Sequence, residues 1–373
     1  MMRVTTNSTL YTYQKNLLKS SNQLYSAMNS MMSGRNFDTY AADPAAATRA
    51  FKIHSSLNAT NTQATNNQAV YNKFSTAWDV ADDLINDLAT NLGQVPALKA
   101  LNDPSSLSTM NTQGDILYSG AEAIVQSLNS KYDNSFIFGG ADTQNPPFAI
   151  EEGEDGMHYV SYRNVLIGYP DETYYGQTYH DADGNEVLKE DGTPMTNQDM
   201  LNSMSEEHLY VDIGIGFQLD KNGNVIDSTA FDASISGLDF IGGAELDEDK
   251  DPTNIVSIML RLSDIFKDYN QEGNSWGAAG NEEDAQRLVD KLTKAQEELS
   301  NQHVNLDTKA KFLQTNQSQL KSSFDSLNSE LNGIEKVDEV EAILTLSAAQ
   351  TSYNAALQVG ANVIPQSLMD YLN

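Results

Sequence analysis

The fold is decided by the stretch from residue 292 to residue 334, LTKAQEELSNQHVNLDTKAKFLQTNQSQLKSSFDSLNSELNGI. Its apolar residues recur at every seventh position, namely Leu292, Leu299, Leu306, Leu313, Leu320, Leu327 and Ile334. A strict seven-residue repeat predicts a long helix that supercoils against partner helices. We expect one helix over 282–334, roughly 80 Å long at 1.5 Å per residue.

Four further segments, 10–31, 74–92, 107–128 and 343–364, show apolar residues at alternating steps of three and four, or every seven. This spacing places the apolar residues on one face of a helix. Ser33-Gly34 is a typical stop for the first of them. We expect the long helix to pack within the chain on helices near 51–92 and 105–132.

The middle of the chain has a different pattern. Residues 159–162 and 210–213 alternate between apolar and polar side chains, as half-buried strands do. Asn222-Gly223, between 217–219 and 225–226, indicates a hairpin. The segment 145–255 has 24 acidic and four basic residues, which gives a net charge of −20.

These patterns predict a mainly α fold, a long coiled-coil helical bundle built from both chain ends, with an inserted β-rich domain. The expected boundaries are 1–40 and 336–373 for terminal coiled-coil helices, 41–145 and 255–335 for the bundle, and 146–254 for the acidic insert.

Composition excludes several classes of function. The 373 residues include 22 Lys+Arg against 52 Asp+Glu, a net charge of −30, and the chain contains no Cys. Binding to nucleic acid or to an anionic membrane needs clustered basic residues. The absence of Cys excludes disulfides and thiolate metal sites, and no run approaches the roughly 18 apolar residues of a membrane helix.

The patterns that suggest enzyme or metal chemistry are each incomplete. Two segments that begin at Asp181 and Asp220 open like calcium loops but lack the Gly and the closing Glu of that motif. Gly214-Ile-Gly216 is only part of a dinucleotide fingerprint, and the five histidines lack metal-ligand spacing. We therefore expect no catalytic, cofactor-binding or metal-binding residues, and predict that the protein is not an enzyme.

The terminal segments have narrow apolar stripes, and together they bury little area. Residues 1–37 carry a net charge of +4 and residues 337–373 a net charge of −4, which favours their pairing weakly. We predict that neighbouring subunits order these ends. The expected subunit contacts are Leu10, Leu17, Leu24, Met31, Leu346, Tyr353, Leu357 and Ile364.

Several segments resemble the flagellin-like family. They are the opening Met2–Asn7, Ser33-Gly34-Arg35 followed by Ala42-Asp43-Pro44, the Phe-Gly-Gly element in Asn134–Gly140 with Thr143 and Pro146-Pro147-Phe148, Ser236–Phe240, and the tail Ser367-Leu368-Met369-Asp370-Tyr371-Leu372. The Phe-Gly-Gly element and the tail resemble the members of this family that join the flagellar hook to the filament. Ala42 departs from the family, which has Asp at that place.

The resemblance implies a structural subunit of the bacterial flagellum that forms the junction between hook and filament. It implies self-association in a ring, contacts with the hook-side junction protein (hook-associated protein 1) and with flagellin, and a type III export chaperone. It also implies an extracellular location after export without a cleaved signal. Two alternatives stay open, flagellin itself and a filament-associated enzyme with its active site in the insert.

Overall fold

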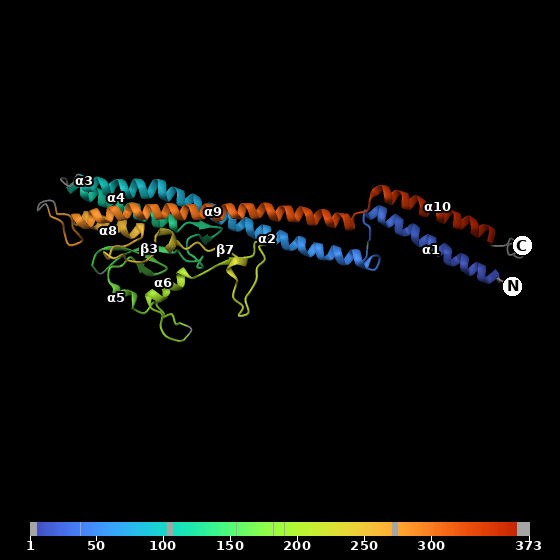
Figure 1. Cartoon of the computed structure of the whole chain (residues 1–373), viewed down its shortest axis with the longest axis horizontal. Coiled ribbons are helices and arrows are strands. Elements are labelled where there is room, and N and C mark those ends of the chain that lie inside the picture. The colour runs from blue at the N-terminus through green and yellow to red at the C-terminus, as the bar shows by residue number, and fades with distance from the viewer. Residues whose placement is uncertain are drawn as a thin grey trace. The chain divides into compact units, whose positions relative to one another are not determined.

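The computed structural model describes residues 6–37, 39–102, 107–153, 155–181, 183–189, 191–270 and 275–363. The chain divides into two compact units. The terminal unit is formed by Met1–Thr62 with Gln319–Asn373, and the central unit by Gln63–Ser318. Two long helices, α2 (Pro44–Asp83) and α9 (Glu282–Glu335), contribute residues to both units (Figure 1). Among the described residues, no helix combines the length and hydropathy needed to span a membrane.

The terminal unit contains α1 (Thr6–Ser33) and α10 (Glu339–Val363), together with the start of α2 and the end of α9. The predicted stop of the first helix is confirmed, because α1 ends at Ser33 and Gly34 follows with a φ of 68°. The Asp43-Pro44 pair starts α2: the Asp43 carboxylate accepts hydrogen bonds from the backbone N–H groups of residues 45 and 46. A carboxylate N-cap followed by Pro is a favourable helix start.

The helices of the central unit confirm the predicted bundle. Besides parts of α2 and α9, the unit contains α3 (Val95–Asn102), α4 (Leu107–Leu128) and α8 (Ile255–Lys267). The seven-residue repeat of α9 joins the central core, where Leu292, Leu299, Leu306 and Leu313 are buried with residues of α2 and α4 such as Phe74 and Leu117. The helix that the repeat predicted over 282–334 therefore extends over 282–335.

One segment of the bundle differs from a regular α-helix. Residues Leu84–Gln94 form a π-helix, η1, between α2 and α3. It packs closely on α4, because a side chain on Gly120 would collide with Leu92 and with Met259. The spacing of apolar residues over 74–92 predicted a helix but did not indicate this wider winding.

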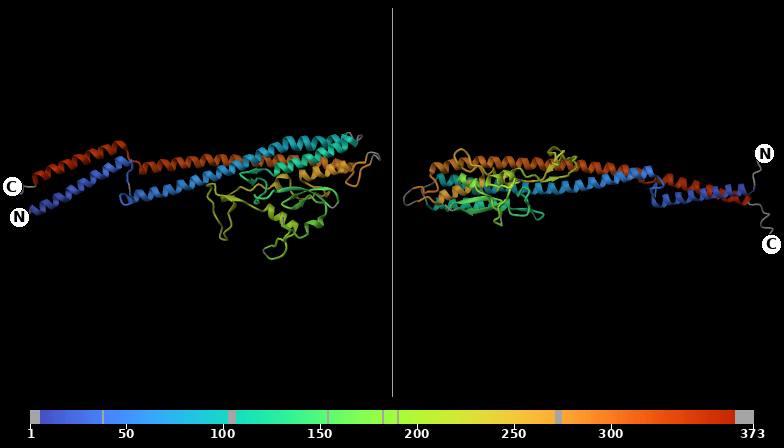
Figure 2. Two further views of the ribbon diagram at one scale, coloured as in Figure 1. Left: turned by 180° about the vertical axis from the view of Figure 1, so that it is seen from behind. Right: turned by 90° about the horizontal axis from the view of Figure 1, so that it is seen from below.

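The insert lies on one side of the helices of the central unit (Figures 1 and 2). A three-stranded antiparallel sheet contains β3 (Phe148–Glu152), β4 (His158–Tyr162) and β5 (Val165–Ile167), and β6 (Tyr210–Val211) pairs with β7 (Phe231–Asp232). The short helices are α5 (Glu172–Tyr175), α6 (Asn197–Ser205), α7 (Gly237–Ile241) and the 3₁₀ turn η2 (Asp227–Thr229). The predicted class, mainly α with an inserted β region, is confirmed, although the sheets are small.

The insert shares one hydrophobic core with the helices, since Val160, Tyr162 and Ile167 belong to the same buried cluster as Phe74 of α2. Polar contacts add to this packing. The Lys73 ammonium of α2 donates to the Ala233 carbonyl at 2.9 Å, and burial lowers the pKa of Lys73 to about 8, with the charge of Asp232 acting in the opposite direction. The predicted domain boundaries stay a prediction.

The Phe-Gly-Gly element has a structural role. It follows the short hairpin of β1 (Lys131–Tyr132) and β2 (Ser135–Phe136). Gly237 donates its N–H to the carbonyl of Phe138 at 2.9 Å, and the rings of Phe138 and Phe240 lie 5.2 Å apart. A side chain on Gly139 or on Gly237 would collide with neighbouring backbone. The element and the segment Ser236–Phe240, which both carry the resemblance, therefore pack on each other.

Candidate assembly surface

The two terminal helices form an antiparallel pair (Figures 1 and 2). Tyr13 of α1 lies against Gly360 of α10. The Tyr13 ring leaves no room for a side chain at position 360. Asp338 starts α10, since its carboxylate accepts from the backbone N–H groups of Val340 and Glu341 at 2.8 and 3.2 Å. This pair brings the two ends of the sequence together. The opposite net charges of residues 1–37 and 337–373 favour such pairing weakly.

The seam of this pair uses one face of each helix. Buried or half-buried residues repeat along this face at steps of three and four. They include Tyr13, Leu17, Ser20, Leu24 and Ala27 on α1, and Ala342, Leu346, Ala349, Tyr353, Ala356 and Gly360 on α10. Many of these side chains are small. A groove of about 630 Å³ therefore runs along the pair, and its lining includes Ser26, Ala27, Ser30, Ala342, Ala348 and Ala349.

The residues predicted as subunit contacts differ in how far they are buried in the single chain. Leu17, Leu24, Leu346 and Tyr353 are half-buried on the faces that form the seam. Leu10, Met31 and Leu357 are exposed, and Ile364 lies outside the described residues. The contact of any of them with a neighbouring subunit stays a prediction.

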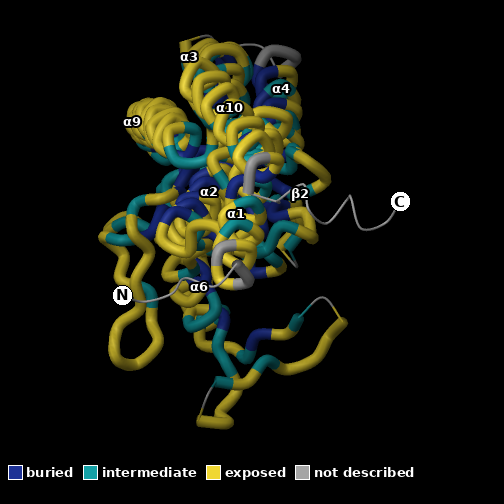
Figure 3. Tube along the Cα trace, turned by 90° about the vertical axis from the view of Figure 1, so that its right-hand side faces the viewer, coloured by how far each residue is buried: buried dark blue, intermediate teal, exposed yellow. Residues whose placement is uncertain are grey.

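A second stripe on α1 is more exposed than the predicted one. It consists of Tyr11, Leu18, Tyr25 and Met32, whose exposed fractions are 71%, 64%, 62% and 80%. We call these four residues the outer stripe. They are seven residues apart, so they lie along one face of the helix. Figure 3 shows that most of α1 and α10 is exposed in the single chain.

The outer stripe was missed in the sequence because it lies one residue beside the stripe that runs through Leu10, Leu17, Leu24 and Met31. Two adjacent seven-residue stripes on one helix suit a helix with partners on two sides. On α10, Ile343, Leu344 and Val359 are also more than half exposed. A large apolar surface of this kind is a typical protein-binding surface.

Charge distinguishes the two helices of the pair. The described part of α1 carries Lys15 and Lys19 and no acidic residue, whereas α10 carries Glu339 and Glu341 and no basic residue. A shallow groove beside the outer stripe includes Lys15, Leu18 and Lys19. The basic face of α1 is therefore complementary to the acidic start of an α10 helix.

The insert contains acidic turns where the sequence suggested calcium loops. Asp181 Oδ1 accepts from the backbone N–H groups of Asp183 and Asn185, and Asp220 Oδ1 accepts from those of Asn222 and Asn224. Hydrogen bonds from its own turn thus occupy one oxygen of each leading carboxylate, which favours the interpretation as turns.

Four of the five histidines have separate side-chain partners. His54 contacts Glu335, His158 contacts Asp264, and His208 contacts Asp232, at 2.8, 2.7 and 2.8 Å. His303 packs on Trp78 with 4.7 Å between ring centroids. These pairs come from different parts of the structure and do not form a shared metal or catalytic arrangement.

A small pocket of about 170 Å³ lies between the insert and the helices of the central unit and is lined by Glu207, His208, Asp232 and Lys309, among others. Two of its carboxylates already have side-chain partners. Arg163 Nη1 donates to Glu207 at 2.5 Å, and His208 contacts Asp232. Ser234, which also lines the pocket, donates its Oγ–H to Asp232 Oδ1 at 2.7 Å, so the Asp232 carboxylate has partners on both oxygens.

No protein-family model and no curated protein sequence matches the chain. Similar solved structures include FlgL from Bacillus cereus, at 13% identity and a TM-score of 0.41, over 75% of this chain and 99% of that one. A putative flagellar hook-associated protein from Vibrio parahaemolyticus has 12% identity and a TM-score of 0.43, over 77% and 100%. Flagellar hook associated protein-3 from Legionella pneumophila has 14% identity and a TM-score of 0.44, over 76% and 98%.

Proposed function

We propose that the chain is a structural subunit of the bacterial flagellum that assembles through its terminal helices at the junction between hook and filament. The observation that carries this proposal is the outer stripe. Four large apolar side chains stand exposed at seven-residue spacing on a helix that is already paired with the other end of the chain. A neighbouring subunit would remove this surface from water, at about 1.5–3 kcal/mol for each fully buried side chain.

The place at the junction rests on the elements that resemble hook-associated protein 3. One is the Phe-Gly-Gly element with Thr143 and Phe148, which packs against Ser236–Phe240 in the core. The other is the tail from Ser367 to Leu372, which lies outside the described residues. These elements favour a junction subunit over flagellin.

The proposal includes the following arrangement and partners. The subunits associate with one another in a ring, with the terminal helices innermost, the bundle around them and the acidic insert outside. Hook-associated protein 1 lies on the hook side and flagellin on the other side. The chain is exported through the flagellar type III apparatus with a chaperone, becomes extracellular, and acts as a structural protein rather than an enzyme.

A deletion strain of the bacterium that encodes the chain tests this function. We expect hooks without filaments, and flagellin released into the medium, because the filament would have no subunit on which to assemble. Electron microscopy and an immunoblot of the medium measure both results, and the intact gene should restore filaments. Normal filaments in the deletion strain would contradict the proposal, and filament loss without flagellin in the medium would favour flagellin itself.

A further inference from the structure

Three loops of the insert share one pattern of backbone hydrogen bonds. In the loops that begin at Asp181, Asp220 and Asp247, the first residue donates its N–H to the carbonyl of the fifth, at 2.9, 2.7 and 2.9 Å. In each, the first carboxylate also accepts from the N–H groups of the third and fifth residues. The fourth residue has a positive φ, and it is Gly in the first two loops and Lys250 in the third.

The third loop differs in its side chains. Asp247, Asp249 and Asp251 occupy the first, third and fifth positions, and one oxygen from each lies within 4.8 Å of the others. Carboxylates at alternate positions of a tight loop are the ligands with which proteins bind calcium. The sequence DEDKD at 247–251 thus has an acidic residue at all three positions, whereas each of the two other loops has Asn at one or both of the last two.

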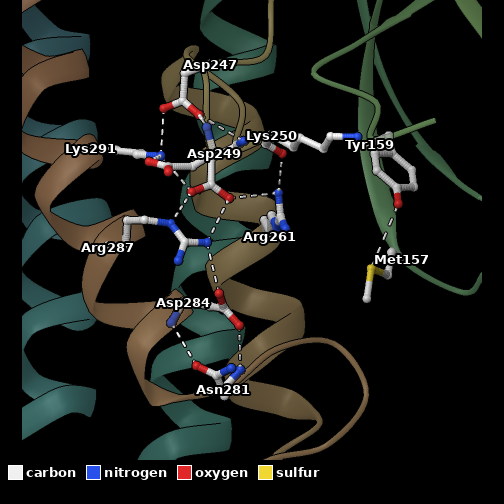
Figure 4. Close-up of polar contacts among 11 residues, drawn as sticks. Met157, Tyr159, Asp247, Asp249, Lys250, Arg261, Asn281, Asp284, Arg287 and Lys291 are labelled. Atoms are coloured by element: carbon white, nitrogen blue, oxygen red, sulfur yellow. Dashed lines mark hydrogen bonds and ion pairs between the residues drawn. The ribbon is translucent and has the colours of Figure 1, made fainter. Parts of the chain in front are cut away.

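A cation from the same chain occupies the centre of this cluster (Figure 4). Lys291 Nζ of α9 lies 2.6 Å from Asp247 Oδ2, 3.0 Å from Asp249 Oδ2 and 2.7 Å from Asp251 Oδ2. The ammonium has three N–H donors, and each acid supplies one acceptor for them. The Lys291 side chain is 14% exposed and that of Asp251 is fully buried, so the contact between these two is shielded from water, whereas Asp249 is 58% exposed.

Two arginines complete the network around Asp251, whose side chain is fully buried. Arg287 Nε lies 2.6 Å and Arg261 Nη1 3.1 Å from its two oxygens, and Arg287 also contacts Asp284 at 2.9 Å. Burial alone would raise the pKa of Asp251, but Arg287, Lys291 and Arg261 hold it below its usual range. Four carboxylates therefore meet three cations, so the cluster is almost neutral without a metal ion.

We propose that Lys291 is the resident cation of the loop 247–251, and that it replaces a divalent metal ion in holding the end of the insert to the start of α9. We call the contacts of Lys291 with Asp247, Asp249 and Asp251 the clamp. The clamp then forms whether or not calcium is present. Removal of the ammonium takes away the ion-pair partner that Asp247 and Asp249 have among the described residues, and both carboxylates then face Asp251, which keeps Arg261 and Arg287. The repulsion among the three carboxylates would destabilise the central unit until a divalent cation entered in place of Lys291.

The test compares the wild type, Lys291→Ala and the control Lys311→Ala by thermal unfolding in EDTA and in about 5 mM calcium, a concentration above the roughly 0.1–1 mM affinities of extracellular calcium modules. Lys311 is a matched control because it also lies on α9 and pairs with one carboxylate, Asp307, but in an exposed position. We expect the wild type and Lys311→Ala to unfold at nearly the same temperature in both solutions.

For Lys291→Ala in EDTA we expect Tm to fall by at least about 5 °C, and calcium to restore about half of the loss. The added change Asp249→Asn should abolish this restoration, because it removes one ligand. A variant that folds only with calcium also meets the expectation. A wild type stabilised by calcium, an unchanged Tm in Lys291→Ala, a loss that calcium does not reduce, or a variant unfolded in both solutions would each overturn the proposal.

Discussion

Replacing Tyr11, Leu18, Tyr25 and Met32 together by Gln is expected to abolish self-association and to leave the monomer folded. The four side chains are 62–80% exposed in the single chain, so their loss costs the monomer little. Gln has a helix propensity close to that of Leu or Met, so α1 should persist. In the assembly, the same change removes several kcal/mol of apolar burial from every interface.

Sedimentation of polymer from purified protein, with circular dichroism of the monomer, measures both effects. We expect the assembled fraction to fall at least about tenfold, which corresponds to a loss of roughly 1.4 kcal/mol or more per contact. The matched control is Leu17→Gln with Leu24→Gln, which changes the half-buried face of the same helix. This control should loosen α1 from α10 in the monomer itself. Equal polymer from the outer-stripe variant and the wild type would show that the outer stripe is not a subunit contact.

Leu299→Asp is expected to have the largest effect on stability. Leu299 is fully buried in the central core, on the seven-residue repeat of α9. The change removes about 1.5–3 kcal/mol of apolar burial and places an unpaired carboxylate in the core. We therefore expect the free energy of unfolding to fall by about 4–6 kcal/mol. A loss of that size approaches the whole stability of many domains, which is about 5–15 kcal/mol.

Urea unfolding followed by circular dichroism measures this loss. Val304→Asp is the control, because Val304 is 61% exposed on the same helix; the same charge there should cost no more than about 0.5 kcal/mol. If the two variants unfold at the same urea concentration, the seven-residue repeat does not form the core of the bundle.

The helical part of the fold could be predicted because its signal is repetitive. Seven apolar residues at one spacing fix both the length of α9 and its buried face, and the predicted helix agrees with the observed one to within one residue. The π-helical winding of η1 could not be predicted in this way. It accompanies close packing against Gly120 and Met259, which lie far from η1 in the sequence.

The assembly surface could be predicted only in part. The sequence shows that α1 has apolar residues at seven-residue spacing, but one such stripe runs through Leu17 and an equally good one through Leu18. Only the partner helix determines which of the two is buried. Once α10 is in place, Leu17 is half-buried and Leu18 is exposed. The face left for other subunits therefore depends on a helix more than 300 residues away in the chain.

The clamp in the insert escaped prediction for a similar reason. Asp247, Asp249 and Asp251 were part of a long acidic segment in which no carboxylate stood out, and Lys291 lies 40 residues beyond Asp251 on the long helix. The repeated loop pattern in Asp181–Asn185 and Asp220–Asn224 was the available signal. A comparison of the three loops would have separated the third, which has acids at all three alternate positions.

The central claim is that the chain forms the junction between hook and filament through its terminal helices. Immunogold electron microscopy of intact flagella, with antibodies against the exposed acidic insert, tests this claim most directly. We predict gold particles in one narrow band where the hook meets the filament, and loss of the band in the outer-stripe variant. Gold along the whole filament, or no gold on flagella that carry normal filaments, would contradict the claim.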